Sequence, residues 1–430
     1  MVQAENLFRK CRLSGYWYSM EIDYSDPGEK QLAGGLHRIC SARATLDRIL
    51  PIKHEFGVTR VANVTGLDRI GLPVVLATRP NSRSVAVSQG KGMSLDQAKV
   101  SAVMEALEIW HAEHFDKPLY FASYLEIAER HEVIDINRLP DIVDNRFTET
   151  QRMLWAQATD IMNARSLLVP FEMVHADYTR PVQPGHGCFP ASTNGLSSGN
   201  HVLEAICHGI CEVIERDALA VWHHAAEPHR VSRRLDPASI DDAACRNALQ
   251  KFEQAGVECG VWDVTSDVGI ASFLCIIREI GGVSGHLGLG SGSHLDRAIA
   301  LRRALTEAAQ TRANYITGSR DDLLLEEYTP HGLKAKNKAV EGLFAASSPR
   351  WQFNQAPSQC NDTLKADLDW LLARLRDVGI EQVGVVDLSR AEFAIPVVRV
   401  IIPGLEAPHD DATYLAGQRA LRAGSGGVPA

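Results

Sequence analysis

The chain has 430 residues, of which 45% are hydrophobic and 23% charged, enough to form a large buried core. Its formal net charge of −9 argues against a broad basic face that binds nucleic acid. Its apolar runs are shorter than the roughly 18 residues that cross a bilayer, and its charged start is unlike a signal peptide. We expect a cytoplasmic protein that binds neither nucleic acid nor membrane, and nine scattered cysteines are typical of a reducing compartment.

Three segments of the chain resemble one another, and each has a glycine- and serine-rich turn followed by an amphipathic helix. They are GKGMSLDQAKVSAVMEALEIW (90–110), GLSSGNHVLEAICHGICEVIERD (195–217) and GLGSGSHLDRAIALRRALTEAAQTR (288–312). In the first two segments the interval from glycine to glutamate is 13 residues, and in the third it is 15. The repetition predicts three related units in one core.

Each predicted helix carries a narrow polar stripe at positions i, i+4 and i+7. The stripes are Ser101, Glu105 and Glu108, then His208, Glu212 and Glu215 with Glu204 one turn earlier, then Arg303, Glu307 and Gln310. A solvated helix face usually interleaves Lys or Arg with Glu, whereas the first two stripes carry neither. We therefore interpret the stripes as the lining of a shared site.

Converging carboxylates need a counter-charge, because two of them about 6 Å apart repel by roughly 3 kcal/mol at an effective dielectric near 20. Oxygen ligands without His or Cys favour Mg²⁺, which usually binds together with phosphate oxygens. The glycine-rich helix starts offer backbone N–H groups to anions, and Lys91 and Arg303 are suited to phosphate. The pattern predicts a nucleoside triphosphate site with Mg²⁺. The candidate metal ligands are Glu105, Glu108, Glu212 and Glu215.

These motifs resemble those of the YcaO family over about residues 34–406. The matching residues are Ser101, Glu105 and Glu108 in S-x3-E-x2-E; Ser197, Asn200, Glu204, Glu212, Glu215 and Arg216 in the second motif; and Arg303, Glu307, Gln310 and Arg312 in the third. The strands and PGLE turn predicted at 383–406 also resemble that family. The resemblance implies that ATP and Mg²⁺ bind between helices, with the four glutamates holding the metal.

The resemblance also implies a set of ATP-binding residues and adds an upstream pair to it. The set is Arg38, Thr45, Lys91, Ser101, Ser197, Asn200, Glu204, Arg216, Arg303 and Glu307. In the upstream pair, Arg38 and Thr45, the match is incomplete because Leu36 replaces a threonine common in the family. The catalytic residues stay unassigned.

YcaO proteins activate a peptide amide oxygen with ATP, after which a nucleophile gives an azoline, an amidine or a thioamide. This chain ends without the P-x-P-x-P tail of azoline-forming members, and residues 57–92 resemble members that work beside a TfuA-like protein. We therefore expect a homodimeric enzyme that forms thioamides in a peptide, with a TfuA-like partner supplying sulfide. The alternatives are an azoline-forming cyclodehydratase, a non-catalytic ATP-binding scaffold, and an accessory protein in methylthiolation of a ribosomal protein.

For the fold we expect an α+β structure of mixed or antiparallel sheets flanked by helices, with the three glycine-turn-helix units lining an ATP cleft. We predict an N-terminal extension (1–33), an ATP-binding domain (34–410) with an inserted subdomain at about 115–185, and a C-terminal tail (411–430). Residues 331–364 are polar and contain proline, which predicts a loop that acts as a lid or a plain connector.

Overall fold

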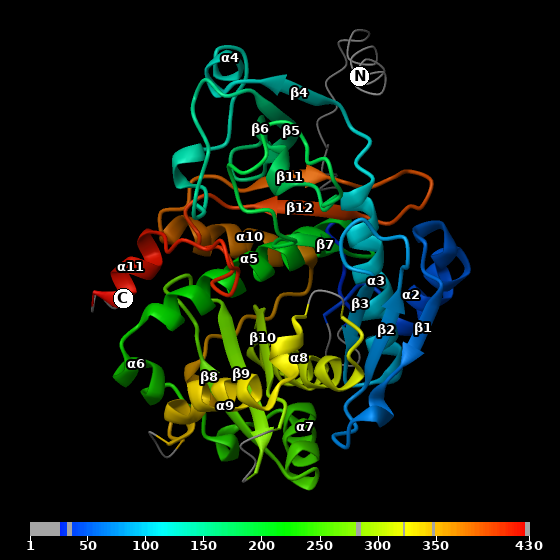
Figure 1. Cartoon of the computed structure of the whole chain (residues 1–430), viewed down its shortest axis with the longest axis vertical. Coiled ribbons are helices and arrows are strands. Elements are labelled where there is room, and N and C mark those ends of the chain that lie inside the picture. The colour runs from blue at the N-terminus through cyan, green and yellow to red at the C-terminus, as the bar shows by residue number, and fades with distance from the viewer. Residues whose placement is uncertain (1–25, 32–36, 281–284, 321–322, 346–348, 426–430) are drawn as a thin grey trace.

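The computed structural model describes residues 26–31, 37–280, 285–320, 323–345 and 349–425. Most of the predicted N-terminal extension and the last residues of the predicted tail therefore lie outside the described residues. The described part is an α+β fold of three sheets flanked by helices, as predicted (Figure 1). Every pair of neighbouring named strands in it is antiparallel.

The largest sheet joins strands from the middle of the chain to strands from its end. Its order is β4–β5–β11–β12–β7, and β6 also pairs with β5. The strands are β4 (Leu119–Ala122), β5 (Met153–Asp160), β6 (Arg165–Pro170), β7 (Leu196–Ser198), β11 (Gly384–Asp387) and β12 (Val397–Ile401). The segment predicted as an inserted subdomain thus supplies three strands to a sheet that β11 and β12 complete, and its boundaries stay predictions.

Two smaller sheets share one plan, in which the third strand leads into a long helix that packs back on the sheet. The first consists of β1 (Arg60–Asn63), β2 (Val74–Thr78) and β3 (Val87–Lys91), followed by α3 (Leu95–Glu113). The second consists of β8 (Val257–Asp263), β9 (Ala271–Glu279) and β10 (Gly288–His294), followed by α8 (Arg297–Thr317). Strand β7 leads into α5 (Val202–His224) in a similar way. These strand–helix pairs are the three repeated units of the sequence.

Several glycines of the repeated segments lie in strands, where they allow a helix to approach closely. A Cβ atom on Gly290 of β10 would fall far inside van der Waals contact with the backbone of Ala304 and Ala308 in α8. A Cβ atom on Gly90 of β3 would meet the backbone of Ala98 in α3 in the same way. Glycine is therefore needed here because a helix lies flat on the preceding strand.

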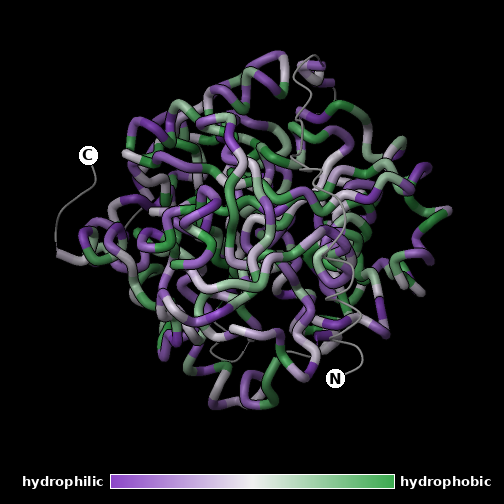
Figure 2. The backbone as a smooth tube through the Cα atoms, turned by 90° about the horizontal axis from the view of Figure 1, so that it is seen from above, coloured by the Kyte–Doolittle hydropathy of each residue, from purple (hydrophilic) through white to green (hydrophobic). Residues whose placement is uncertain are grey.

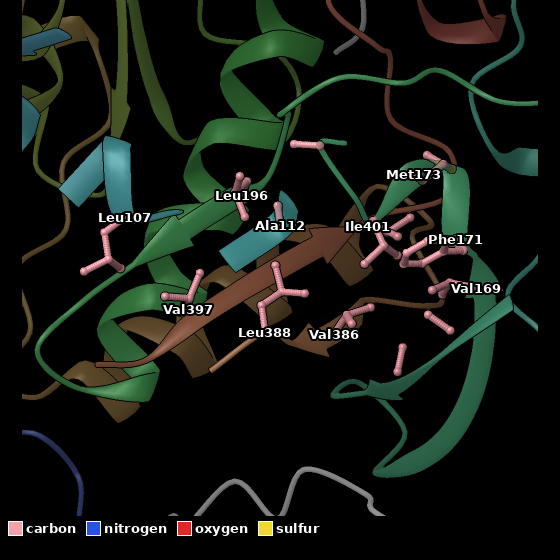
Figure 3. Close-up of a cluster of buried hydrophobic side chains, with 14 of the residues drawn as sticks. Leu107, Ala112, Val169, Phe171, Met173, Leu196, Val386, Leu388, Val397 and Ile401 are labelled. Atoms are coloured by element: carbon pink, nitrogen blue, oxygen red, sulfur yellow. The ribbon is translucent and has the colours of Figure 1, made fainter. Parts of the chain in front are cut away.

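The cores hold α3 and α5 so that only one side of each faces the site. Leu107 and Ala112 of α3 belong to a buried cluster with Val397 of β12 (Figure 3). Leu203 and Ile210 of α5 are fully buried in a second cluster. In Figure 1, α5 crosses the middle of the molecule between the six-stranded sheet and β8–β10. Hydrophobic and hydrophilic stretches are interspersed along the whole backbone (Figure 2).

The other α-helices of the described residues are shorter than α3, α5 and α8. They are α2 (Ala42–Ile49), α4 (Tyr124–Ala128), α6 (Glu227–Ser232), α7 (Ala243–Gln254), α9 (Pro330–Ala345), α10 (Leu364–Asp377) and α11 (Gln418–Gly424). The prediction of a loop at 331–364 was wrong over α9, because Val340 and Phe344 are buried against Trp262 and hold a helix there. Among the described residues, none of the helices has the length and apolar character to cross a bilayer.

Candidate functional site

A cavity of about 620 Å³ opens between α3, α5 and α8, and its wall also includes residues of α2 and β3. The predicted site residues that line it are Arg38, Thr45, Lys91, Ser101, Glu105, Glu108, Asn200, Glu204, Glu212, Glu215, Arg216, Arg303 and Glu307. The structure thus brings together every predicted site residue except Ser197. Three stretches of chain far apart in the sequence contribute their polar stripes to one wall.

Ser197 lies on the other face of β7, away from the cavity. It is fully buried, and its hydroxyl donates to the carbonyl oxygen of Ala205 at 2.8 Å. Its neighbours Leu196 and Ser198 line the cavity instead, because successive side chains of a strand point to opposite faces. The Ser198 hydroxyl donates to Oε1 of Glu108 at 2.5 Å. Ser198, and not Ser197, is therefore the serine of this motif that lines the cavity.

The upstream pair is tied to the second unit by direct hydrogen bonds. Arg38 forms an ion pair with Glu204 at 2.6 Å, and the Glu204 side chain is only 4% exposed. Thr45 donates from its hydroxyl to Oδ1 of Asn200 at 3.2 Å, and Arg48 donates to the same oxygen at 3.0 Å. One part of the cavity wall is therefore fixed by contacts between residues 38–48 and residues 200–204.

A second ion pair joins the first unit to the third. The Lys91 ammonium donates to Oε2 of Glu307. Burial alone would raise the pKa of Glu307, but Lys91 and Arg216 hold that pKa below its ordinary value. Glu307 is therefore an anion whose charge is already balanced by the protein.

In three other carboxyls of the cavity, burial outweighs the nearby cations and raises the pKa. Burial raises the pKa of Glu105 to about 7, although Lys91 opposes the shift. Burial also raises the pKa of Glu108 to about 8, and repulsion from Glu212 adds to the shift. The pKa of Glu212 is raised by burial as well. Burial therefore disfavours the charged form of these three carboxyls, and a bound divalent cation would offset that penalty.

The fourth proposed metal ligand is held firmly by strand β10. Glu215 accepts the Ser291 hydroxyl at 2.6 Å and the Ser293 backbone N–H at 2.8 Å, one on each carboxylate oxygen. Each oxygen keeps a further lone pair, so these bonds orient the carboxylate without using up its capacity. The contact also fixes α5 against the third unit.

The residues present fit Mg²⁺ that binds together with a triphosphate. Within the described ranges, no three His, Cys, Asp or Glu side chains form a preformed metal cage. Mg²⁺ usually takes one or two carboxylates and completes its octahedron with water and phosphate oxygens, so no such cage is required. Arg303 also lines the cavity, and its Nε is buried without a hydrogen-bond partner. A phosphate oxygen would satisfy that N–H.

Two residues of the third motif separate in the structure. Gln310 lines the cavity, whereas Arg312 is buried outside it and bonds Asp68 at 3.1 Å and Glu279 at 3.0 Å. Arg312 therefore ties α8 to its surroundings. The sequence-based reasoning also missed Gln89 and Asn314, which line the same cavity. The signal that could have found Asn314 is its place one turn beyond Gln310 on the same helix face.

Comparison with protein families adds a decisive observation. A family model described as YcaO cyclodehydratase, ATP- and Mg²⁺-binding, matches residues 89–406, well over half of the chain. This chain belongs to the YcaO family. YcaO proteins of this description bind ATP and Mg²⁺, and this member does so as well.

Relatives and solved structures agree with this assignment. An uncharacterised protein from the tfuA 3′ region of Rhizobium leguminosarum bv. trifolii is 35% identical over 396 residues, which cover 89% of this chain and 92% of the relative. An uncharacterised protein of Methanothermobacter thermautotrophicus is 35% identical over 357 residues, covering 81% of this chain and 90% of the relative. The fold of YcaO from Methanopyrus kandleri, bound with AMPPCP and Mg²⁺, matches with a TM-score of 0.70 at 22% identity, covering 92% of this chain and 98% of that one. A heterocyclase in complex with substrate and cofactor matches with a TM-score of 0.72 at 21% identity, covering 88% of this chain and 54% of that one.

Proposed function

We propose that this YcaO protein uses ATP to phosphorylate the oxygen of a peptide backbone amide, and that sulfide then replaces this oxygen to give a thioamide. The observation that carries the proposal is the meeting of cationic side chains and buried carboxyl groups in one cavity. The gene context of the Rhizobium relative, in the tfuA 3′ region, supports a TfuA-like partner that delivers sulfide. The TfuA-like partner, the homodimer and the cytoplasmic location stay predictions.

The proposed reaction has two steps. The amide oxygen attacks the γ-phosphorus of ATP, ADP leaves, and the amide carbon becomes electrophilic. Hydrosulfide then adds to that carbon, and the C–O bond breaks. The oxygen leaves as phosphate, which takes up the hydrosulfide proton, and a C=S bond remains. The activation is needed because the amide oxygen is a poor leaving group until it carries phosphate.

The residues of the cavity supply binding, orientation and charge for these steps. Arg303 and Lys91 face the space where the phosphates would lie and would stabilise negative charge on the transferring group. Glu105, Glu108 and Glu212 would hold Mg²⁺, which when bound offsets the charge of the triphosphate. These carboxylates come from two helices that are fixed in separate cores. Through the bound metal they would position the γ-phosphate for attack by the amide oxygen.

Two substitutions test the site. Glu105→Ala and Glu212→Ala each remove one proposed metal ligand, and we expect both to reduce ATP hydrolysis at least a hundredfold. Glu129→Ala, at an exposed position on the surface, is the control. Unchanged hydrolysis in both site variants would disprove the assignment.

Mass spectrometry of a co-expressed precursor peptide tests the reaction. Exchange of oxygen for sulfur adds about 16 Da, whereas the alternative azoline chemistry removes about 18 Da as water. The mass loss must be checked because the matching family is described as a cyclodehydratase. ATP binding without release of ADP, in the presence of peptide and partner, would instead support a scaffold or accessory protein.

A further inference from the structure

Three buried side-chain amides form a cluster in the wall of the cavity. They are Gln89 of β3 and Gln310 and Asn314 of α8, exposed by 4%, 9% and 6%. Oε1 of Gln89 accepts Nε2 of Gln310 at 3.2 Å and also accepts Nδ2 of Asn314. Nε2 of Gln89, Oε1 of Gln310 and Oδ1 of Asn314 are buried without a hydrogen-bond partner.

This amide cluster has more hydrogen-bonding capacity than its members use. Each amide offers two N–H donors and an oxygen with two lone pairs. Two bonds within the cluster therefore leave most of that capacity unmet, whichever way each amide is turned. Buried polar groups without partners are rare in folded proteins because they weaken the fold. A group that enters the cavity and pairs with these three atoms would remove that cost.

The amide cluster lies beside the proposed reaction centre. The backbone N–H of Gln89 bonds the carboxylate of Glu105. Lys91 follows Gln89 by two residues on the same strand, so both side chains leave the same face of β3. Gln310 follows Glu307 by three residues on α8, which places the two side chains on one helix face. The cluster is therefore about one helical turn from the Lys91–Glu307 ion pair and from one proposed metal ligand.

We propose that the amide cluster binds the backbone amide of the peptide that is phosphorylated, and this inference rests on the proposed function. A peptide bond offers an N–H and a carbonyl oxygen, which complement an amide side chain. The cluster carries no charge, so it suits a neutral group better than phosphate, for which Arg303 and Lys91 are available. Binding by the cluster would present the carbonyl oxygen to the γ-phosphate.

The edge of adenine offers the same pairing of a donor and an acceptor. The chemistry that the cluster recognises is thus an amide-like edge, and the experiment must separate the peptide from the nucleobase. The peptide is favoured because the cluster adjoins the carboxylate of Glu105 and the Lys91–Glu307 pair, where the transferred phosphate would lie. Cys40, Ala42 and Ile109 also line the cavity and offer apolar surface that suits a base.

The test uses two variants of similar shape without amide groups, Gln310→Met and Asn314→Leu, in the full chain. Thr311→Val is the matched control, because Thr311 also lines the cavity but lies outside the cluster. The probe is N-acetyl-glycylglycine N-methylamide, observed by saturation-transfer NMR on protein saturated with AMPPCP and Mg²⁺. We expect the transfer signal of the probe to fall at least fivefold in both variants and to persist in the control, with the Kd for AMPPCP changed less than twofold.

A thermal melt of the ligand-free variants separates binding from a purely structural role. Removing a buried amide whose bonds are mostly unmet is expected to leave Tm unchanged or to raise it by about 1–3 °C. A fall of about 2 °C or more in both variants, with the control unaffected, would show a structural network and overturn the proposal.

Three other results would also overturn the proposal. A tenfold weaker Kd for AMPPCP would assign the cluster to adenine. An unchanged probe signal in both variants would assign it to an ordered water, and the absence of any probe signal on the unsubstituted protein would exclude a peptide site. These failures leave the proposed function intact if Glu105→Ala still abolishes ATP hydrolysis, so the two proposals fail separately.

Discussion

Replacing Glu108 with Gln removes a carboxylate that the nucleotide-free protein stabilises poorly. Its pKa is raised from 4.5 to about 8, chiefly by burial. The folded protein therefore holds the Glu108 proton more tightly than the unfolded chain, and Glu108 costs stability as pH rises from about 4.5 to 8. The full shift corresponds to about 5 kcal/mol as an upper bound, and solvent in the cavity reduces this to about 2 kcal/mol.

Thermal unfolding between pH 5 and pH 8.5, without nucleotide, measures this cost. We expect Glu108→Gln to raise Tm by about 2 °C at pH 8 and to change it little at pH 5. Adding AMPPCP and Mg²⁺ should stabilise the unsubstituted protein more at pH 8 than at pH 6, because the metal needs ionised carboxylates. This gain should shrink in Glu108→Gln. The exposed Glu129→Gln is the control. A Tm change that does not depend on pH would refute the reasoning.

Two further predictions concern paired positions. Ser198→Ala is expected to raise KM for MgATP roughly tenfold, because it removes the hydrogen bond that orients the Glu108 carboxylate. Ser197→Ala should leave KM unchanged. Equal KM values in the two variants would contradict the assignment of Ser198 to the site. Gly290→Ala is expected to lower the free energy of unfolding by about 3 kcal/mol or more, because the new methyl group meets the α8 backbone. Gly318→Ala, with open space around it, should cost only about 1 kcal/mol for its positive φ; urea unfolding measures both, and similar costs would contradict the packing argument.

The polar stripes could be predicted from the sequence because helix geometry is local. Glu105 and Glu108 lie on one face of α3 whatever surrounds that helix. That Glu105 and Glu108 meet Glu212 was also predictable. The opposite face of each helix is apolar and packs in a core, and carboxylates brought together in this way need a shared counter-charge. The structure gathers these three residues in one cavity.

Which side chains of β7 face the cavity could not be predicted in the same way. Whether Ser197 or Ser198 faces the cavity depends on the pairing of β7 with β12, where Ser198 is opposite Val397 and Ser197 opposite Val398. That register is set by the whole sheet and not by the serine motif. The role of Gly290 was hidden for a related reason, since a close approach between strand and helix leaves no local pattern.

The central claim is that carboxylates from α3 and α5 share a metal with the phosphates of ATP. The most direct measurement is a crystal structure of the chain with AMPPCP and Mn²⁺, in which anomalous scattering locates the metal. The account predicts metal within bonding distance of a carboxylate oxygen of Glu105 or Glu108 and of Glu212 or Glu215, with phosphate oxygens completing the coordination. Metal bound away from these carboxylates, or a nucleotide outside the cavity, would contradict it.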